Sequence, residues 1–396
     1  VPCYGNRVRE IPVSKRSGPT PRPQSRPAET PSETGLRRGV ALQGLTPAAL
    51  VRAVPELLLE EARRVVAQVH RDEDPRTPSS GIRRTSREAV TRAGWVPQLE
   101  VKETRASRVD PFVKYALTTA DGHVVETVRI PLERQGRFSV CVSSQVGCAL
   151  GCSFCATGRL GLLRNLETWE IVEQVRIVRR GLEGGGLRSA PERVHGVVFQ
   201  GMGEPMANLD RVLAAIEVMS DPSALAIDAR AITVCTSGLP SGIRRLAREA
   251  PKVRLGMSIG SALVSTRRSL MPIERSHSLE EVVAAACEHA TLTGLAPMWA
   301  VTLLAGVNDG VEHAHALADL VASFRDRTGR SPRLSVIPYN AIGPANDGAG
   351  DPFARAADDR EQAFRDALRE RGVFSHRRYS GGADVDAACG QLAARA

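Results

Sequence analysis

The chain has 396 residues, 42% of them hydrophobic, and carries a formal net charge of +9. This length and apolar content can bury a large core, which excludes a wholly disordered chain and favours one large domain with attachments. The sequence has no uncharged apolar run of about 18 residues, and its N-terminal stretch lacks the apolar region of a secretory signal. We therefore expect a cytoplasmic protein that does not enter a membrane.

The net positive charge indicates a class of partner, and the cysteines indicate a class of chemistry. Lys and Arg outnumber Asp and Glu by 53 to 44, which suits a polyanionic partner such as nucleic acid. A soluble basic protein from an Arg-rich proteome explains the same excess. Thiols stay reduced in a cytoplasm, so the eight cysteines are expected to be metal ligands, nucleophiles or core residues rather than structural disulfides.

The N-terminal part of the chain predicts a tail followed by helices. Residues 1–40 are rich in Pro, Ser and Arg and nearly free of large apolar side chains, so we predict a disordered basic tail. In residues 41–93, Leu, Val and Ala recur at helical spacing, Thr46 is placed to cap a helix and Pro47 to begin it. We therefore predict a small helical accessory domain. This domain and the tail are where we expect RNA to bind, because residues 1–40 hold eight Arg and Lys against three Glu. A solvated tail without a partner explains the same charge equally well.

Residues 94–140 predict a β-rich linker, with the turn pair Asp121 and Gly122 between two strand-like runs. From residue 141 to residue 396, short apolar runs at 194–201, 231–238, 253–260, 297–306 and 333–340 alternate with helical stretches at 166–182, 209–219, 278–290 and 310–324. Apolar strands that are separated by single helices indicate a parallel sheet covered by helices. We therefore predict an α/β fold with a full or partial barrel, whose reactive groups gather where the strands end.

The segment GCALGCSFCATG, residues 147–158, sets Cys148, Cys152 and Cys155 close together. A zinc site would need a fourth ligand, and no second cysteine pair follows downstream. Redox chemistry of the thioredoxin type would use Cys152 and Cys155 and leave Cys148 unexplained. A 4Fe-4S cluster held by three thiolates accounts for all three cysteines and leaves one iron open, whereas a chance group of core cysteines is the remaining alternative.

The spacing of these cysteines, with Phe154 directly before the third, resembles the signature of the radical S-adenosylmethionine (SAM) superfamily. The resemblance implies that the amino and carboxylate groups of SAM bind the open iron. It further implies that an electron donor such as flavodoxin or ferredoxin drives cleavage of the sulfonium to a 5'-deoxyadenosyl radical.

Longer blocks carry a closer resemblance. They are CVSSQVGCALGCSFCATGRLGLLRNLETWEIVEQV, GMGEPMANLD, TSGLPSGIRRLA, LLAGVNDGVEHAHALADL and DVDAACGQL. In their order and spacing these blocks resemble the RlmN/Cfr family of radical SAM RNA adenine methyltransferases. The resemblance implies a radical-SAM partial (βα) barrel, which we expect to act as a monomer, with a 4Fe-4S cluster and SAM as cofactors.

The resemblance also implies catalytic roles outside the cysteine segment. Cys389 would accept a methyl group from one SAM, the radical from a second SAM would activate that methyl, and the methylene would add to the base. Cys141 would then release the product and form a disulfide with Cys389, while Glu126 would accept a proton. From the residues alone, Cys141 could equally be a buried strand residue and Glu126 an exposed residue or a salt-bridge partner.

Six residues match the family's SAM contacts, and two of them depart from its pattern. The glycines of GMGEP allow a close backbone approach, and Glu204 can accept a hydrogen bond from the amino group of methionine. The full set is Gly203, Glu204, Cys235, Ser258, Gly260 and Asn340. The family usually has serine where Cys235 stands and histidine where Gly260 stands.

The RNA side of the resemblance implies carbon 2 of an adenosine in 23S rRNA as the target, with a tRNA adenosine beside the anticodon as a further candidate. Carbon-2 methyltransferases tend to keep an Arg-Gly-Asp-Asp run before the last cysteine block, and Gly381 and Ala383 replace two of its charged residues. Methylation at carbon 8, as in the antibiotic-resistance branch, is the alternative within the family. A paralogue that acts on a non-RNA substrate, or an inactive SAM-binding protein, also stays open.

Overall fold

The computed structural model describes residues 39–183, 192–342 and 350–393, and its central feature is a ten-stranded mixed sheet. The strand order is β14-β13-β12-β11-β10-β9-β6-β5-β4-β3. These strands are β3 (Glu100–Ala106), β4 (Val113–Thr118), β5 (Val124–Pro131), β6 (Arg137–Cys141), β9 (Arg193–Phe199), β10 (Ile232–Thr236), β11 (Arg254–Ser258), β12 (Met298–Leu303), β13 (Arg333–Pro338) and β14 (Ser375–Arg377). The predicted basic tail, residues 1–40, lies outside the described residues except for its last two positions.

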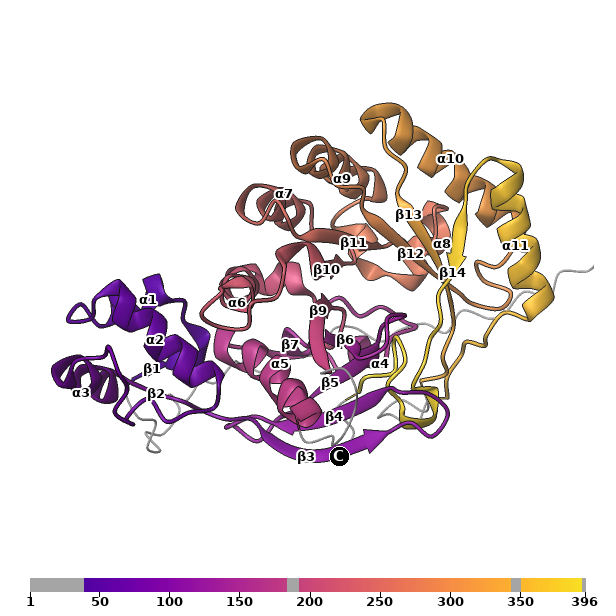
Figure 1. The fold of residues 1–396 in the computed structure, drawn as a ribbon. Helices are drawn as coiled ribbons and strands as arrows, with labels where there is room; N and C mark the ends of the chain where they lie inside the picture. The colour runs from indigo at the N-terminus through magenta and orange to yellow at the C-terminus, as the bar shows by residue number, and fades with distance from the viewer. Residues whose placement is uncertain (1–38, 184–191, 343–349, 394–396) are drawn as a thin grey trace, which may run out of the picture. The chain divides into compact units, whose positions relative to one another are not determined.

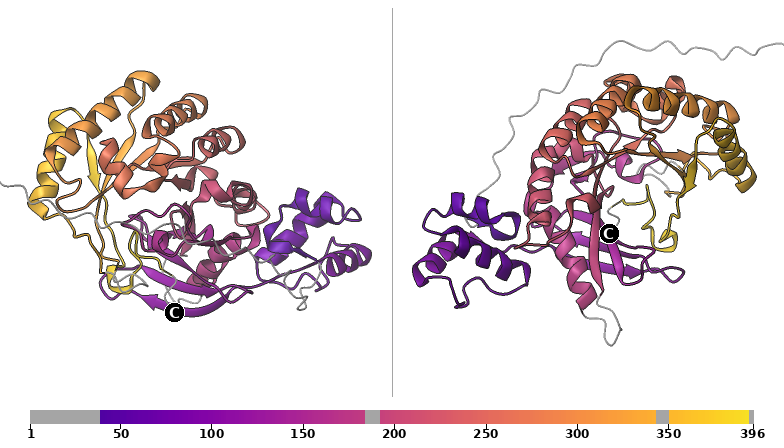
Figure 2. Two further views of the ribbon diagram at one scale, coloured as in Figure 1. Left: turned by 180° about the vertical axis from the view of Figure 1, so that it is seen from behind. Right: turned by 45° about the horizontal axis from the view of Figure 1, so that its top comes forward.

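From β6 through β14 neighbouring strands run parallel, so their C-terminal ends lie at one edge of the sheet. Helices that connect these strands follow one another along the outer side of the curved sheet (Figures 1 and 2). They are α5 (Thr168–Glu183), α6 (Leu209–Ser220), α7 (Pro240–Glu249), α9 (Leu279–Thr293), α10 (Val311–Thr328) and α11 (Asp358–Glu370). Helix α8 (Val264–Leu270) instead contacts the cysteine segment, where Ser153 N donates to Leu270 O at 3.0 Å. Because β14 and β3 are the two edge strands, the barrel is partial, and the predicted α/β class is confirmed.

Shorter elements lie between the main strands and helices. The four-residue helix α4 (Ala156–Arg159) follows the cysteine segment, and a two-stranded sheet of β7 (Gln145–Gly147) and β8 (Leu162–Asn165) flanks both. The short 3-10 helices are η2 (Pro205–Asn208), η3 (Ala229–Ala231), η4 (Pro272–Arg275) and η5 (Ala383–Val385).

Local sequence explains where the barrel helices begin and end. At the start of α9, the Ser278 side chain accepts a hydrogen bond from Glu281 N at 3.3 Å, and the Glu281 carboxylate accepts one from Ser278 N at 3.0 Å. This reciprocal cap satisfies two backbone donors, and the helix ends where Gly294 adopts a positive φ of 71°. Between sheet and helices the core is built of buried apolar side chains, and Trp299 of β12 packs edge-on against Phe324 of α10 at 5.2 Å between ring centroids.

The predicted β-rich segment, residues 94–140, joins the barrel's own sheet. Strands β3, β4 and β5 pair antiparallel with one another, and β5 pairs antiparallel with β6. The turn between β4 and β5 contains Asp121 and Gly122 as predicted, and Gly122 adopts a positive φ of 82°. The antiparallel strands therefore extend the parallel sheet, which places the residues of β4 and β5 beside the end of β6.

The N-terminal helices form a separate cluster of buried side chains. They are η1 (Leu42–Gly44), α1 (Pro47–Ala53), α2 (Leu59–His70) and α3 (Arg84–Ala93), and the two-residue strands β1 (Val40–Ala41) and β2 (Gly94–Trp95) pair beside them. As predicted, Pro47 begins α1, and the Thr46 side chain accepts a hydrogen bond from Ala49 N at 3.2 Å. Arg176 of α5 connects this cluster to the barrel, because it donates to Val69 O at 2.8 Å and pairs with Asp72.

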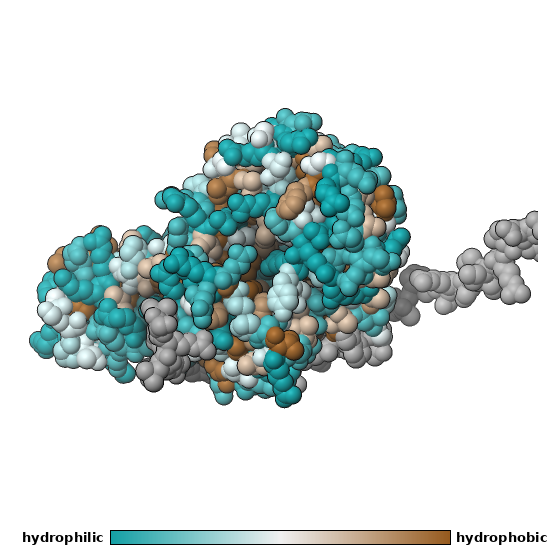
Figure 3. Space-filling model, turned by 45° about the vertical axis from the view of Figure 1, so that its right-hand side comes forward, coloured by the Kyte–Doolittle hydropathy of each residue, from teal (hydrophilic) through white to brown (hydrophobic). Residues whose placement is uncertain are grey.

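The surface is mostly hydrophilic in the view of Figure 3, and hydrophobic residues are exposed there in separate small groups. None of the helices in the described ranges combines the length and the apolar character that crossing a membrane would require.

Candidate active site

A cavity of about 1000 Å³ lies where the parallel strands of the barrel end. The lining residues include the last residues of β9, β10 and β11. Among the residues singled out from the sequence, the cavity is lined by Cys148, Cys152, Cys155, Gly203, Glu204, Cys235, Ser258, Gly260 and Cys389. Residues from distant parts of the chain therefore face one space, at the end of the barrel where such folds hold their reactive groups.

The backbone of the cysteine loop is set by close contact between two glycines. Gly147 adopts a positive φ of 77°, and a Cβ atom at this position would lie 1.8 Å from Gly161 O. The next residue, Cys148, donates its N–H to the same Gly161 carbonyl at 2.8 Å. A larger residue at position 147 would push β7 and β8 apart, so glycine is required for Cys148 to reach the cavity.

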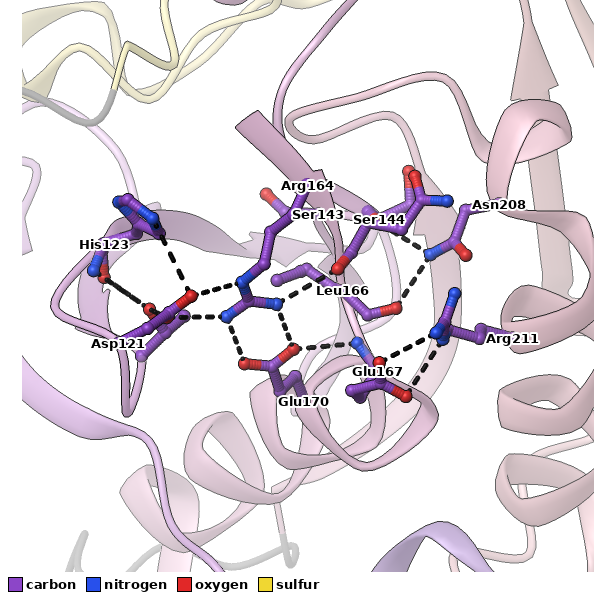
Figure 4. A network of polar contacts seen from close by, with 12 residues as sticks. Asp121, His123, Ser143, Ser144, Arg164, Leu166, Glu167, Glu170, Asn208 and Arg211 are labelled. Atoms are coloured by element: carbon purple, nitrogen blue, oxygen red, sulfur yellow. Dashed lines mark hydrogen bonds and ion pairs between the residues drawn. The ribbon is translucent and has the colours of Figure 1, made fainter. Parts of the chain in front are cut away.

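A polar network holds the strands on either side of the cysteine loop (Figure 4). Arg164 of β8 donates to Asp121 in the β4–β5 turn at 2.6 Å and to Glu170 of α5 at 2.8 Å. Asn208, which ends η2, donates to Ser144 O at 2.8 Å. Since β7 runs directly into Cys148 and β8 follows α4, this network fixes the loop relative to the sheet.

The loop cysteines lie in an environment that disfavours free thiolates. Burial raises the pKa of Cys148 and of Cys152 to about 12, and burial also raises the pKa of Cys155. A thiolate ligand is stabilised when a metal supplies positive charge. Among the described residues, no three His, Cys, Asp or Glu side chains are grouped so as to hold a single metal ion. The three loop cysteines nevertheless all line the cavity.

The GMGEP segment places a carboxylate in the cavity lining. Gly203 has a positive φ of 101°, and a Cβ atom there would lie 2.6 Å from the Gln145 Cβ. Glu204 accepts hydrogen bonds from Met206 N at 3.0 Å and Ser237 N at 2.9 Å. Burial raises the pKa of Glu204, and these backbone donors oppose that effect. The carboxylate is thus oriented before any ligand arrives.

The two positions that depart from the family pattern have local structural explanations. Cys235 of β10 lies opposite Gly256 of β11, and a Cβ atom on Gly256 would lie 2.6 Å from the Cys235 sulfur. Gly260 has a positive φ of 68°, and a Cβ atom there would lie 2.5 Å from the Met271 sulfur. A histidine at position 260 would be strained in this backbone conformation and would collide with Met271. Gly256 and Met271 are therefore the residues that set the space available at these two positions.

Hydrogen bonds fasten the segment around Cys389 to the cysteine loop. Ala156 N donates to Gly390 O at 2.9 Å, and Thr157 Oγ1 donates to Leu392 O at 2.5 Å. Asn340, which follows β13, donates to Cys389 O at 3.2 Å. Asn340 is thus turned to the C-terminal segment and does not belong to the described residues that line the cavity, so its contact with SAM stays a prediction.

The disulfide between Cys141 and Cys389 that is expected from turnover is not present in this structure. Cys141 is buried at the end of β6, where it interacts electrostatically with Cys389 and Cys235. Every cysteine in the described part of the chain is nevertheless a free thiol. The sulfurs therefore do not lie at the bonding distance of about 2.05 Å that a disulfide requires. Burial raises the pKa of Cys141 and of Cys235 to about 12.

Glu126 lies in a second cavity of about 300 Å³, which Lys114, Asp386 and Ala393 also line. Its carboxylate pairs with Lys114 Nζ at 3.1 Å and accepts a hydrogen bond from Ala393 N at 2.8 Å. Lys114 Nζ also donates to Asp386 O at 3.3 Å. Glu126 therefore binds the C-terminal segment beside Cys389 and is not among the described residues that line the larger cavity. Its role as a proton acceptor stays a prediction.

Sequence reasoning missed a latch that holds the C-terminal segment on the antiparallel side of the sheet. The latch consists of Asp110, Phe112, Tyr379, Gly381 and Gly382. Asp110 Oδ2 accepts hydrogen bonds from Tyr379 Oη and from Gly382 N, both at 2.9 Å. A Cβ atom on Gly381 would lie 2.4 Å from Phe112 Cε2, so the arginine that the family tends to keep here would displace Phe112. No local sequence signal connects positions 110 and 382.

Comparison with known proteins places these features in context. No family model matches the chain. A probable RNA methyltransferase of Sorangium cellulosum (strain So ce56) is 59% identical over 351 residues, which are 85% of this chain and 88% of that protein. A dual-specificity RNA methyltransferase RlmN of Syntrophobacter fumaroxidans is 41% identical over 285 residues, which are 72% of this chain and 77% of that protein.

A solved structure resembles the whole barrel. The crystal structure of a radical SAM methyltransferase from Sphaerobacter thermophilus superposes with a TM-score of 0.78 at 34% sequence identity. The match covers 90% of this chain and 99% of that protein.

We expect Gly381→Ala to loosen the segment that carries Cys389, because the added methyl group would overlap Phe112. Amide hydrogen exchange across residues 380–392 should rise roughly tenfold, which corresponds to about 1.4 kcal/mol of easier local opening. Exchange in β10 and β11 should not change. Gly350→Ala is the matched control, because nothing lies within 4 Å of a Cβ atom at that position. Equal exchange of the segment in the parent and in Gly381→Ala would contradict the latch.

Proposed function

The chain belongs to the RlmN family of radical SAM RNA methyltransferases, and from this premise we propose that it methylates carbon 2 of an adenosine in 23S rRNA. A tRNA adenosine is a second substrate under the same proposal, because the relative from Syntrophobacter fumaroxidans is named as a dual-specificity enzyme. We further propose that the protein acts in the cytoplasm as a monomer and takes electrons from a flavodoxin or ferredoxin.

One observation carries the proposal. The loop thiols, the GMGEP carboxylate and the Cys389 thiol line a single cavity, although they come from opposite ends of the catalytic region. A reaction that needs a cluster, SAM and a carrier thiol requires all three in one space, since the reacting groups must come within bonding reach of one another. If these cysteines had only a structural role, nothing would require them to line the same cavity.

The residues present fit the two cofactors. Cys148, Cys152 and Cys155 would hold a 4Fe-4S cluster, and Glu204 with the ends of β10 and β11 would hold SAM. When bound, the two would supply a methyl group and a one-electron route to a carbon radical. Such a route suits adenine carbon 2, because this electron-poor carbon does not displace a methyl group from SAM by itself.

Three side chains would then act on the reacting groups. Cys389 is the proposed methyl carrier, because it is half-buried and lines the cavity. Cys141 is the proposed second thiol that frees the methylated base, because it interacts electrostatically with Cys389 while lying outside the cavity lining. Glu126 is the proposed proton acceptor, and it would have to exchange the Ala393 N–H for the base when the C-terminal segment moves.

The basic part of the chain supports an RNA substrate. Lys and Arg exceed Asp and Glu by 53 to 44 over the whole chain. We propose that the helices α1 to α3 and the tail at residues 1–40 bind RNA phosphates, which is the sequence-independent part of recognition.

The target base is tested by mass spectrometry of 23S rRNA and tRNA. The RNA is taken from a strain in which the gene for this protein is deleted, from the same strain complemented with the gene, and from the parental strain. We expect 2-methyladenosine to be absent from the RNA of the deletion strain. Displacement of a methyl group from SAM cannot methylate this carbon, so it would not replace the missing enzyme. Loss of 8-methyladenosine instead would move the target to carbon 8. If both modified nucleosides stay at parental levels, the RNA proposal is wrong and a non-RNA substrate takes its place.

A cluster prediction follows from the three loop cysteines. The protein reconstituted without oxygen should be brown and contain iron and sulfide near four of each per chain, as a cubane cluster requires. Replacing Cys148, Cys152 and Cys155 by Ala together should abolish both the colour and SAM cleavage. Cys287→Ala is the matched control, because this buried thiol of α9 lies outside the cavity lining. A colourless, zinc-loaded and active parent would refute the cluster.

The proposed roles of Cys389 and Cys141 can be distinguished by the covalent product that accumulates when each thiol is removed. Cys389→Ala should bind the cluster normally yet form neither a methylated protein nor an RNA adduct, because the methyl carrier is gone. Cys141→Ala should still be methylated at Cys389, add to the base and remain covalently joined to RNA. Nuclease digestion followed by intact-mass measurement would detect the nucleotide remnant. Release of free, methylated RNA by Cys141→Ala at the parental rate would make Cys141 an ordinary strand residue.

A further inference from the structure

The edge strand β14 is flanked by two exposed aromatic side chains. Among the Phe, Tyr and Trp side chains that the structure describes, only Phe374 and Tyr379 are exposed, with 71% and 69% of their surface accessible. Tyr379 belongs to the latch, so its position already has an explanation. Phe374 directly precedes β14, and its ring contacts the ring of His376 edge-on at 4.9 Å between centroids. A large ring gains most from burial, so this pair of exposed rings indicates a binding surface.

Strand alternation places His376 on the inner face of the sheet, which is the face away from the helices. Arg377 pairs with Glu361 of α11 at 2.8 Å, so it faces the helical layer (Figure 1). Because side chains alternate along a strand, His376 and Arg378 face the other way. Arg378 Nη1 donates to Gln200 Oε1 at 3.1 Å, and Gln200 lines the larger cavity. The face of β14 that carries His376 and its aromatic neighbour therefore leads to the cavity.

The neighbouring strand β13 continues this face and adds a cation. Ser335 lies opposite His376 in the parallel register, and Ile337, two residues further along, lines the cavity. Two residues before Ser335, Arg333 is therefore on the same face, beside Phe374. The Arg333 side chain is exposed, and none of the carboxylates in the described part of the chain lies within ion-pair distance of it. An exposed ring and an unpaired cation thus lie side by side.

A row of rings and a cation suits single-stranded RNA. Aromatic side chains stack on unpaired bases of any sequence, and arginine contacts the phosphates between them. Successive side chains on one face of a strand lie about 6.7 Å apart, so the rows from Arg333 to Ile337 span about 13 Å. This strip leads to the cavity, so nucleotides on it would flank a base held in the cavity. The chain's net charge of +9 favours the same polyanion.

We propose that the inner face of β13 and β14 is a docking surface for single-stranded RNA. A base beside the target adenosine stacks on Phe374 and His376, and Arg333 contacts a neighbouring phosphate. This inference rests on the proposed function for the identity of the partner as RNA, and it adds a surface on the barrel to the helices and tail already proposed to bind RNA phosphates.

The test measures by fluorescence anisotropy how tightly the full chain binds a labelled single-stranded RNA of about ten nucleotides, with one adenosine among uridines. In Phe374→Leu, which keeps an apolar side chain but removes the ring, we expect the Kd to rise roughly tenfold, because stacking on one base is lost. Phe374→Trp should bind at least as tightly as the parent, and the RNA should quench the indole fluorescence that this variant adds. Leu292→Ala is the matched control, because Leu292 is also exposed but lies on α9, and its Kd should equal that of the parent.

Salt dependence separates the ring from the cation. Arg333→Gln should weaken binding and reduce the slope of log Kd against log salt concentration by about 0.7, the value for one phosphate contact on a single strand. Phe374→Leu should leave this slope unchanged, because stacking releases no counterions. Parental Kd values for both Phe374→Leu and Arg333→Gln would overturn the proposal.

Failure of this inference is distinguishable from failure of the proposed function. A parent that methylates RNA, with a Kd that Phe374→Leu does not change, would refute the docking surface alone. A parent whose RNA binding depends on Phe374 but which methylates no adenosine would support the surface and refute the reaction. If Phe374→Leu keeps the parental Kd for RNA but slows reduction of the cluster by reduced flavodoxin, the face binds the electron donor, and the RNA surface is refuted.

Discussion

The hydrogen bonds between the C-terminal segment and the cysteine loop are the interaction on which the site depends. Ala156 N and Thr157 Oγ1 donate to the carbonyls of Gly390 and Leu392, so Cys389, which directly precedes Gly390, is held against the loop. Cys389 and Gly390 therefore line the same cavity as the loop cysteines, although the hydrogen-bonded residues Thr157 and Leu392 are 235 positions apart in sequence. The latch at Asp110 and the contact of Glu126 with Ala393 hold the same segment from the other side.

Residues that depart from the family pattern lie in close contact with neighbouring side chains. Gly381 lies against Phe112, and Gly260 lies against Met271. Cys235 occupies the space that Gly256 leaves open. Because the interior is close-packed, a larger side chain at position 381 or 260 would displace its neighbour. The glycine at position 381 therefore suits the packing of Phe112, through which the antiparallel side of the sheet contacts the segment that carries Cys389.

Local patterns could predict the elements, but they could not predict which distant residues meet. The alternation of apolar strands with helices was enough to predict the partial barrel. The Asp121–Gly122 turn and the Thr46 cap could each be predicted from a few neighbouring residues. The spacing of the loop cysteines also limited their chemistry. The position of Glu126 was less predictable, because its contacts with Lys114 and Ala393 depend on strand pairing and on the path of the chain end.

Burial sets the electrostatic problem of the site. It raises the pKa of Cys148, Cys152 and Cys141 to about 12, so these thiols stay protonated near neutral pH. Iron would supply the positive charge that the loop thiols need in order to bind as thiolates, and it would arrive only with the cluster. The loop therefore holds its cysteines as neutral thiols until a cluster is assembled.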